Sequence, residues 1–258
     1  MDIVIQGGMW SGTVGTAEQY SNLPFVNNVI ISTWEDEQLP TEISHNIQVL
    51  KNKKPTHPGP GNINLQIVSS LEGVKASTAN EVMKIRSDQR ITNKSFKLIY
   101  DFYQSNKNQE TLNYLSGDKQ KSKIFVIGNN KNYPYHPQDH IYWGYKDDVI
   151  KLLDIPLCDE EPYPGAVCPA GYFNNHIRSP MYIGMHYYAK FFVEAKNHVD
   201  NWKDYVLDGS TNRKVAMDFY TPIRDKIFQV LPRLDMHWEK YNSGYWYSYE
   251  ADGEYYAD

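Results

Sequence analysis

Two short segments of the sequence concentrate side chains that can do chemistry. The first is KIRSD, where Lys84 and Arg86 alternate along a strand-like run that ends in Asp88. Arginine and lysine bind phosphate oxygens, and a carboxylate can hold Mn²⁺ or Mg²⁺ against a diphosphate. The segment therefore favours a phosphate site in which Asp88 is the candidate metal ligand. The alternative is a turn or cap aspartate, which is common after a strand.

The second segment is His136-Pro137-Gln138-Asp139-His140. Asp139 is a candidate general base for a hydroxyl group, with His136 or His140 orienting it or completing a metal site. The histidines are four residues apart, but Pro137 favours a turn or a helix start over a helix interior. The zinc-protease pattern H-E-x-x-H is not present in the sequence. A capping aspartate between exposed histidines is the alternative interpretation.

Two further polar segments follow apolar runs. Trp34-Glu35-Asp36-Glu37 comes after the run 29–33, where nucleotide-binding α/β proteins often place an acidic residue for a ribose or a base edge. Gln6-Gly7-Gly8 comes after the run 3–5, and glycine lets backbone amides approach a nucleotide closely. Neither segment is a G-x-G-x-x-G or P-loop motif. A solvated acidic loop is an equal alternative for residues 34–37.

The hydrophobic pattern around these segments predicts alternating strands and helices. Buried strands are expected at 3–5, 29–33, 82–86 and 124–127, and helices over about 14–23 and 63–78. Thr92 is the expected N-cap of a third helix with Phe96, Ile99 and Phe102 on one face. This order predicts an α/β fold with a largely parallel sheet. Ligands gather beyond the carboxyl ends of such strands, where the polar segments stand.

The second half of the chain predicts a helical elaboration of one domain, residues 1–258. Helices are expected over 147–153, 180–199 and 222–231, whereas 51–61 and 156–180 are rich in proline and glycine and predict loops. The Tyr-rich stretch 182–192 is expected to be buried within the domain, and a homodimer face is the alternative. Cys158 and Cys168 form either two free thiols or one disulfide.

The composition narrows the partners and the location. The chain has 258 residues, 41% of them hydrophobic and 22% charged, which is typical of a globular protein. A net charge of −5 without a basic stripe argues against a nucleic-acid partner. The N-terminus does not have the pattern of a signal peptide, and no apolar run approaches the ~20 residues of a membrane span. We therefore expect a cytoplasmic protein, at most peripheral at a membrane.

Five stretches taken together resemble the WavE-type lipopolysaccharide-synthesis proteins. They are VIQGG, ISTWEDE, NLQIVSSLEGVKAS, VMKIRSDQRI and YHPQDHIYWGYKDDVIKLLDI, between residues 3 and 155. KIRSDQ and the segment around Asp139 are the most specific. The resemblance implies a GT-A-like fold that binds a nucleotide-diphospho-sugar. It also implies a glycosyltransferase that moves the sugar to a glycan, glycolipid or glycoprotein acceptor.

The resemblance also implies roles for individual residues. Residues 1–128 become the half that binds the nucleotide sugar, and 129–258 the acceptor half with the C-terminal helices. The residues implied or predicted to contact the donor are Gln6, Gly7, Trp34, Glu35, Asn64, Gln66, Ser69, Lys84, Arg86 and Asp88. Asp139 takes the acceptor side as base, which fits direct displacement with inversion.

One departure from the family pattern concerns the metal. The usual D-x-D motif supplies two carboxylates, but Arg86-Ser87-Asp88 supplies only one. A requirement for Mn²⁺ or Mg²⁺ is therefore left open, and Arg86 can take part of the charge role.

Two other functions stay as alternatives. A sugar nucleotidyltransferase shares the α/β layout, but the first strand is not followed by a Gly-rich loop bearing Arg or Lys. A non-catalytic carbohydrate-binding protein would suit the aromatic C-terminus of a chain with 21 Tyr and 6 Trp.

Overall fold

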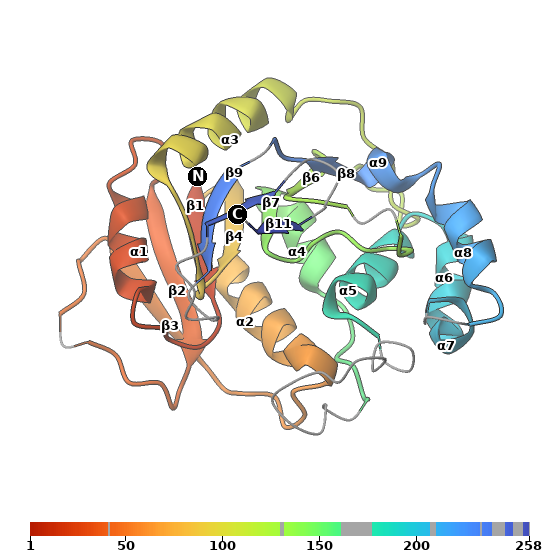
Figure 1. Ribbon diagram of the computed structural model, residues 1–258, viewed down its shortest axis with the longest axis horizontal. Helices are drawn as coiled ribbons and strands as arrows, with labels where there is room; N and C mark the ends of the chain where they lie inside the picture. The colour runs from red at the N-terminus through yellow and green to blue at the C-terminus, as the bar shows by residue number, and fades with distance from the viewer. Residues whose placement is uncertain are drawn as a thin grey trace.

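The main sheet of the computed structural model has seven strands in the order β3-β2-β1-β4-β7-β6-β8 (Figure 1). The structure describes residues 1–40, 42–129, 132–160, 177–206, 210–232, 234–238, 246–249 and 255–257. The strands are β1 Asp2–Gln6, β2 Asn28–Trp34, β3 Ile47–Asn52, β4 Glu81–Arg86, β6 Ile124–Val126, β7 Ile141–Tyr145 and β8 Phe228–Val230. Only β7 runs antiparallel to its two neighbours, β4 and β6. The predicted α/β fold with a mostly parallel sheet is confirmed.

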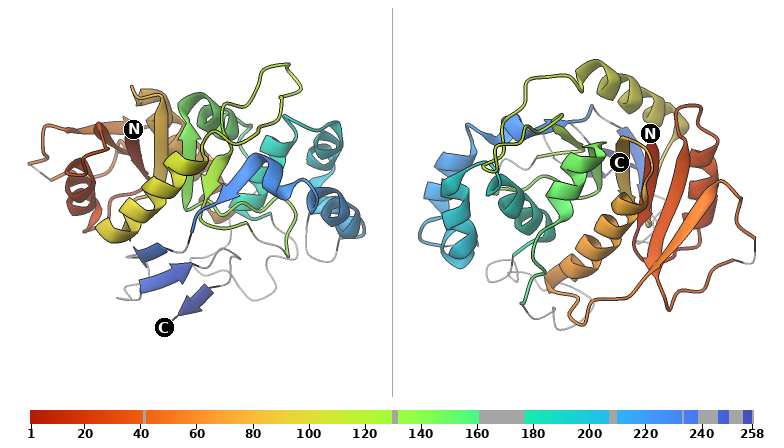
Figure 2. Two further views of the ribbon diagram at one scale, coloured as in Figure 1. Left: turned by 90° about the horizontal axis from the view of Figure 1, so that it is seen from above. Right: turned by 180° about the vertical axis from the view of Figure 1, so that it is seen from behind.

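Helices cover both faces of this sheet (Figures 1 and 2). The helices of the first part are α1 Thr13–Ser21, α2 Ile63–Ala76, α3 Asn93–Asn106 and α4 Lys146–Leu153. Successive side chains of a strand point to opposite faces. Val4 of β1 therefore belongs to the core shared with α2 and α4, whereas Ile3 and Ile5 belong to the core shared with α1 and α3. This double burial explains the continuous β-branched runs of the sequence.

The predicted elements of the first half are confirmed with small shifts of their ends. Thr92 is the N-cap of α3, and its side chain accepts a hydrogen bond of 3.2 Å from the Ser95 backbone amide. The predicted loop over 51–61 is wrong at its start, because Lys51 and Asn52 belong to β3. β3 is an edge strand held by backbone pairing with β2. Ile47 and Asn52 at its two ends are buried, but the four side chains between them are exposed or only partly buried, so β3 has no long apolar run to reveal it.

Two predicted C-terminal helices are wrong in extent. The stretch 180–199 forms two helices, α5 Ser179–Tyr188 and α6 Val193–Asp200. The chain turns between them, where Phe191 stacks on Tyr114 with ring centroids 4.4 Å apart and Lys190 Nζ donates to Asp154 O at 2.8 Å. The stretch 222–231 contains only the short α9 Arg224–Ile227 before β8, because Phe228–Val230 pairs with β6. Two more helices, α7 Trp202–Tyr205 and α8 Arg213–Tyr220, precede α9.

A second sheet was not predicted. Its order is β11-β10-β9-β5, formed by β5 Gln89–Ile91, β9 Leu234–Trp238, β10 Trp246–Tyr249 and β11 Tyr255–Ala257. The Tyr-rich helix α5 buries Tyr182, Tyr187 and Tyr188 inside the molecule, in line with the expectation of burial. Cys158 is a buried free thiol, whereas Cys168 and residues 161–176 of the predicted loop lie outside the described residues. None of the described helices has the length and apolarity that crossing a membrane requires.

Candidate functional site

The direction of β7 brings together the two segments that carry the candidate reactive side chains, 84–88 and 136–140. The parallel strands β1, β2 and β4 end at the same edge of the sheet, at Gln6, Trp34 and Arg86. Because β7 runs the opposite way beside β4, it begins at this edge, with Ile141 opposite Ile85. Asp139, two residues before β7, therefore lies near Arg86. Residues more than 50 positions apart in the sequence meet at one place.

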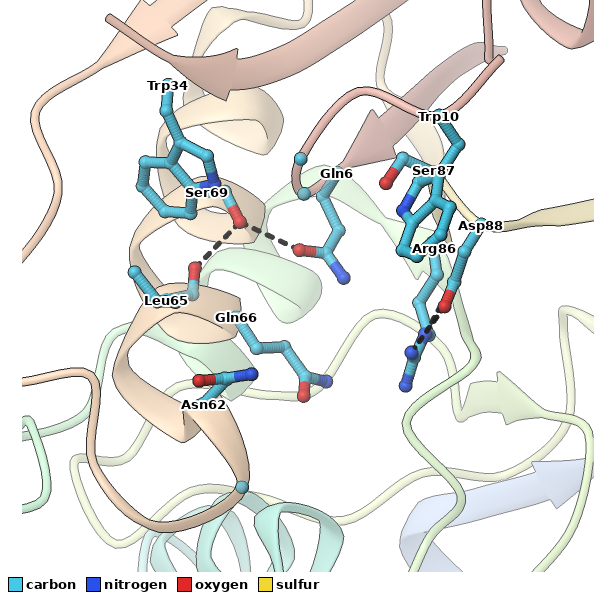
Figure 3. A pocket seen from close by; sticks show the side chains of 13 residues that line it. Gln6, Trp10, Trp34, Asn62, Leu65, Gln66, Ser69, Arg86, Ser87 and Asp88 are labelled. Carbon is cyan, nitrogen blue, oxygen red and sulfur yellow. Dashed lines mark hydrogen bonds and ion pairs between the residues drawn. The ribbon is translucent and has the colours of Figure 1, made fainter. Parts of the chain in front are cut away.

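A cavity of about 240 Å³ opens at this edge (Figure 3). Its walls come from the ends of β1, β2 and β4, from the loops after β1 and β4, and from the start of α2 with the two residues before it. It is lined by Gln6, Gly7, Gly8, Trp10, Trp34, Gly61, Asn62, Leu65, Gln66, Ser69, Arg86, Ser87 and Asp88. Of the ten predicted donor contacts, seven line it: Gln6, Gly7, Trp34, Gln66, Ser69, Arg86 and Asp88.

The wall formed by β1 and α2 is held in place by short polar contacts. Ser69 Oγ lies 2.7 Å from Gln6 Oε1 and 2.7 Å from the carbonyl oxygen of Leu65. Gly7 has a φ of +119°, and a Cβ at this position would lie 2.8 Å from Ser87 Oγ. Only glycine adopts this backbone conformation without strain. The loops after β1 and β4 can therefore close on each other around the cavity.

Arg86 and Asp88 form a bidentate ion pair on the opposite wall. Arg86 Nε lies 2.9 Å from Asp88 Oδ1, and Arg86 Nη2 lies 2.7 Å from Asp88 Oδ2. The Asp88 side chain is 4% exposed and the Arg86 side chain 22%. Both carboxylate oxygens therefore face a guanidinium. Nowhere in the described part of the chain do three His, Cys, Asp or Glu side chains gather as a metal site would require. These residues fit a divalent cation poorly.

Asp139 is buried next to the cavity, beside two of its lining residues, Gln66 and Arg86. Burial acts to raise the pKa of its carboxyl group, but His140, Arg86, Lys84 and Gln66 favour the charged form, and the pKa is lower than usual. Asp139 is therefore ionised at neutral pH. Gln66 lies close enough to contribute, although its Nε2 makes no hydrogen bond of standard geometry within the described residues.

Lys84 of β4 contacts the backbone of Asp139 with its buried side chain. Its side chain is fully buried, and its Nζ donates to the backbone oxygen of Asp139. Burial lowers the pKa of this amine to about 7, although the charge of Asp139 acts in the opposite direction. Lys84 was predicted to contact phosphates. The structure places it beneath the cavity, outside the lining residues.

The two predicted histidines are buried beside Asp139. Burial lowers the pKa of His136 to about 4 and that of His140 to about 3, so both rings are neutral at neutral pH. His140 Nδ1 contacts the side-chain amide of Gln89, while His136 Nδ1 has no hydrogen-bond partner in the described regions. Residues 132–140 form an irregular segment, so the two histidines do not share a helix.

Helix α5 packs tightly against the segment that carries Asp139. A Cβ at Gly184 would lie 2.1 Å from the Tyr135 carbonyl oxygen and 2.6 Å from Pro137 Cδ. Tyr135 itself has a φ of +56°, and its hydroxyl lies 2.6 Å from His198 Nδ1 of α6. The C-terminal helices therefore determine where this segment lies.

Besides Lys84, two predicted donor contacts lie outside the cavity lining. Glu35 is exposed on the loop after β2. Asn64 is buried, where its Nδ2 donates to the carbonyl oxygens of His57 and Cys158 and its Oδ1 accepts from the Cys158 amide at 2.7 Å. Asn64 thus joins two loops. Six lining residues were not among the predicted contacts, namely Gly8 and Ser87 within the predicted segments and Trp10, Gly61, Asn62 and Leu65 outside them. The only signal for the last four residues in the sequence was that they lie near the glycines that follow β1 and the glycines that precede α2.

The fold and the site define an α/β protein with a polar cavity at the carboxyl ends of its parallel strands, where such folds bind their ligands. The pattern of the WavE lipopolysaccharide synthesis family matches residues 20–183. The chain belongs to this family, which confirms the resemblance seen in the sequence. No curated protein sequence matches the chain.

Several solved structures are distantly similar. HddC from Yersinia pseudotuberculosis is 9% identical with a TM-score of 0.33, over 58% of this chain and 78% of HddC. TarS from S. aureus is 11% identical with a TM-score of 0.42, over 73% of this chain and 33% of TarS. Mouse xyloside xylosyltransferase 1 in its apo form is 9% identical with a TM-score of 0.40, over 90% of this chain and 84% of that protein. This chain spans about a third of TarS.

Proposed function

We propose that this protein is a glycosyltransferase of lipopolysaccharide synthesis. It moves a sugar from a nucleotide-diphosphate donor to a hydroxyl of a glycan or glycolipid, and Asp139 acts as general base. Membership of the WavE family supports the process. The observation that carries the chemistry is the position of the ionised Asp139 beside Arg86 and Gln66, at the edge of a polar cavity at the strand ends.

The cavity suits the donor nucleotide. Trp34 and Trp10 offer aromatic surfaces to a base or a sugar ring, and Gln6, Asn62 and Gln66 offer amides. Arg86 supplies a positive charge for the diphosphate. We assign the donor to this cavity and the acceptor to the side of Asp139.

The reaction is a direct displacement at the anomeric carbon. Asp139 accepts the proton of the acceptor hydroxyl while that oxygen forms the new bond to the anomeric carbon. The bond from this carbon to the phosphate oxygen breaks, and the nucleoside diphosphate leaves with the electron pair. Arg86 stabilises the negative charge that builds on the leaving oxygen. Attack opposite the leaving group inverts the anomeric configuration.

The test is a nucleotide-release assay with a panel of sugar nucleotides and with deacylated lipopolysaccharide fragments as acceptors. We expect one donor to give nucleoside diphosphate and a glycosylated product of opposite anomeric configuration. Pyrophosphate release from a nucleoside triphosphate would instead indicate a nucleotidyltransferase. Glycan binding in calorimetry without affinity for any donor would indicate a non-catalytic carbohydrate-binding protein.

A further inference from the structure

We propose that the diphosphate of the donor is bound by the Arg86 guanidinium and the first turns of α2, without a divalent cation. This inference rests on the proposed function and concerns the same cavity. It gives Asp88, the residue predicted to bind a metal, the different task of positioning Arg86.

The first argument concerns Asp88. Mg²⁺ and Mn²⁺ bind oxygen ligands, carboxylates foremost among charged side chains. Asp88 is the only carboxylate among the described residues that line the cavity, and Arg86 bonds to both of its oxygens at 2.9 and 2.7 Å. A cation on the same oxygens would lie against a guanidinium, and like charges repel strongly where water is scarce. Asp88 therefore fixes the arginine.

The second argument concerns Arg86. It lines the cavity and is the more exposed partner of the pair, with 22% of its side chain accessible against 4% for Asp88. A guanidinium carries five N–H donors in a planar fork that matches phosphate oxygens. Its charge is permanent, so it can offset the leaving diphosphate at any pH at which the protein is folded.

The third argument comes from the facing wall, where α2 begins. The N-cap Asn62 makes no side-chain capping bond, and the first turn of α2 contains no acidic residue. The positive end of the helix dipole is therefore not offset by a carboxylate of its own first turn. Figure 3 shows Gln66 of this helix on one side of the cavity and Arg86 on the other.

A second observation at this wall points to a ligand. Gln66 is 9% exposed, and its Nε2 makes no hydrogen bond of standard geometry among the described residues, although its side-chain amide lies close enough to Asp139 to lower the pKa of that carboxyl group. The side-chain amide carries two N–H donors, so a contact with Asp139 leaves one of them for another acceptor. An oxygen of a bound phosphate would accept a hydrogen bond from this N–H, because Gln66 lines the same cavity as Arg86.

Calorimetry with UDP, GDP, ADP and CDP tests the proposal on the full chain. Each nucleotide is titrated once with EDTA and once with Mg²⁺ or Mn²⁺. We expect one of them to bind, with a Kd that changes less than about threefold between the two conditions. Binding that appears only with the metal would overturn the inference and leave the proposed function standing. Absence of binding in both conditions would overturn both.

Variants separate the roles of the pair. Arg86→Gln should weaken nucleotide binding in EDTA by at least about tenfold, and Arg86→Lys should restore part of it because the charge remains without the fork. Gln66→Leu should weaken binding by roughly threefold to tenfold. The Asp88→Asn variant should still bind the nucleotide in EDTA. If Asp88 were instead a metal ligand, the substitution would abolish only the nucleotide binding that depends on the metal.

The matched control is Arg224→Gln on α9. Arg224 pairs with Asp225 in the same manner, at 3.0 and 3.1 Å, but does not line the cavity. Its replacement should leave the Kd unchanged. Circular dichroism confirms that each variant is folded. Equal binding by Arg86→Gln and the wild type would contradict the proposal.

Discussion

At the Asp139 carboxylate, burial and charge act in opposite directions. Burial would favour the neutral acid, which cannot accept a proton. Arg86 and Lys84 lie close enough to keep the group ionised, while His140, with a pKa of about 3, is neutral at neutral pH and contributes little there. The residue is therefore in the form that a general base needs. The same cations also make it a weaker base, so its effect depends on how closely the acceptor hydroxyl is held.

Replacing Asp139 by Asn should abolish this proton transfer and keep the shape of the side chain. We expect turnover to fall by roughly 10²- to 10⁴-fold in the nucleotide-release assay. Asp101→Asn on the exposed face of α3 is the control, since Asp101 pairs only with Lys97 at the surface. Calorimetry with the nucleoside diphosphate shows whether the Asn variant is still folded and competent to bind. Full turnover by Asp139→Asn would contradict its role.

Between α2 and the sheet, close packing depends on one glycine. A Cβ at Gly73 would lie 2.4 Å from Val4 Cγ1 and 2.8 Å from Ser32 Cβ. The helix therefore approaches β1 and β2 as closely as a residue without a side chain allows. The N-terminal turns of the same helix carry Gln66 and Ser69, so this contact also positions the cavity wall.

Gly73→Ala should thus destabilise the protein by about 1–3 kcal/mol through overpacking. Gly15→Ala is the matched control, because Gly15 lies in α1 with nothing within 4 Å of an added Cβ. Alanine is the better helix former by about 1 kcal/mol, so this control should be neutral or stabilising. Urea denaturation measures both changes. Equal effects of the two substitutions would show that helix propensity, and not packing, determines the change in the free energy of unfolding.

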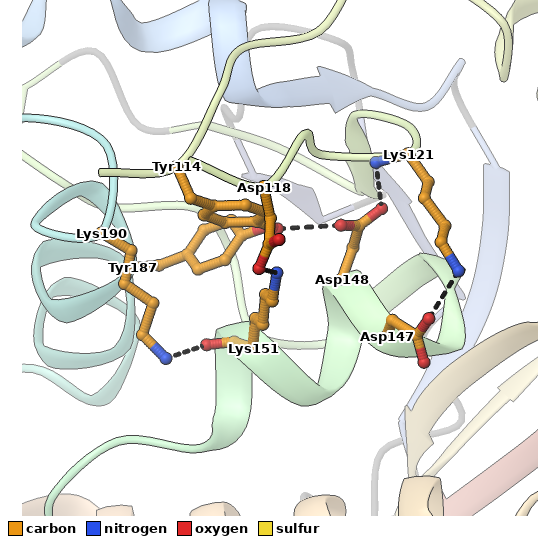
Figure 4. Close-up of polar contacts among 8 residues, drawn as sticks. All are labelled: Tyr114, Asp118, Lys121, Asp147, Asp148, Lys151, Tyr187 and Lys190. Atoms are coloured by element: carbon orange, nitrogen blue, oxygen red, sulfur yellow. Dashed lines mark hydrogen bonds and ion pairs between the residues drawn. The ribbon is translucent and has the colours of Figure 1, made fainter. Parts of the chain in front are cut away.

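Asp148 joins helix α4 to the loop between α3 and β6 (Figure 4). Its Oδ1 accepts from the Tyr114 hydroxyl at 2.8 Å, and its Oδ2 accepts from the backbone amides of Lys121 and Ser122 at 2.8 and 3.1 Å. Burial nevertheless raises the pKa of this carboxyl group. These bonds hold the loop that leads into β6.

Asp148→Ala leaves three donors without their acceptor, and we expect it to lower the free energy of unfolding by about 3 kcal/mol. Its neighbour Asp147 offers the control. Asp147 is exposed and pairs only with the Lys121 side chain at 2.5 Å. Asp147→Ala should cost less than about 1 kcal/mol. Denaturant unfolding at neutral pH compares the two, and an equal loss would argue against the network.

For the whole molecule, buried histidines predict a sensitivity to acid. Burial lowers the pKa of His136 and His186 to about 4 and that of His140 to about 3. In the unfolded chain each histidine titrates near 6.5. Below that pH the unfolded state takes up protons that the folded state refuses. The corresponding stability is complete above pH 6.5 and is lost as the pH falls toward 4 and below.

We therefore expect the midpoint temperature of unfolding to fall steadily between about pH 6.5 and 4. His186→Gln tests the cause, because His186 lies on α5 outside the cavity lining, where its ring packs against that of Tyr182 with centroids 4.4 Å apart. The variant should show a smaller drop over this window than the wild type. Differential scanning calorimetry at several pH values measures both. Parallel curves would assign the acid sensitivity to carboxyl groups.

The sequence could predict the strands that are buried on both faces of the sheet. Continuous β-branched runs such as 29–33 favour a strand of this kind. It could not predict β7, whose Tyr142, Trp143 and Gly144 do not form such a run. The break between α5 and α6 depends on the contact between Phe191 and Tyr114, residues distant in sequence. Local pattern does not contain this information.

Some features of the site could likewise be predicted from the sequence, and others could not. The rule of strand ends located Gln6, Trp34 and Arg86, because it needs only the ends of elements. It could not tell which face of α2 lines the cavity. Gln66 and Ser69 are three residues apart and share a face, while Asn64 points elsewhere into the loops.

The close approach at Gly184 has a consequence for sugar transfer. A side chain there would displace Tyr135 and Pro137, and with them the neighbouring Asp139, although Gly184 is not among the described residues that line the cavity. On the proposed function, substitutions in α5 should therefore impair sugar transfer as well as substitutions at the strand ends. We expect such variants to bind the proposed nucleotide normally and to lose the proposed transfer step.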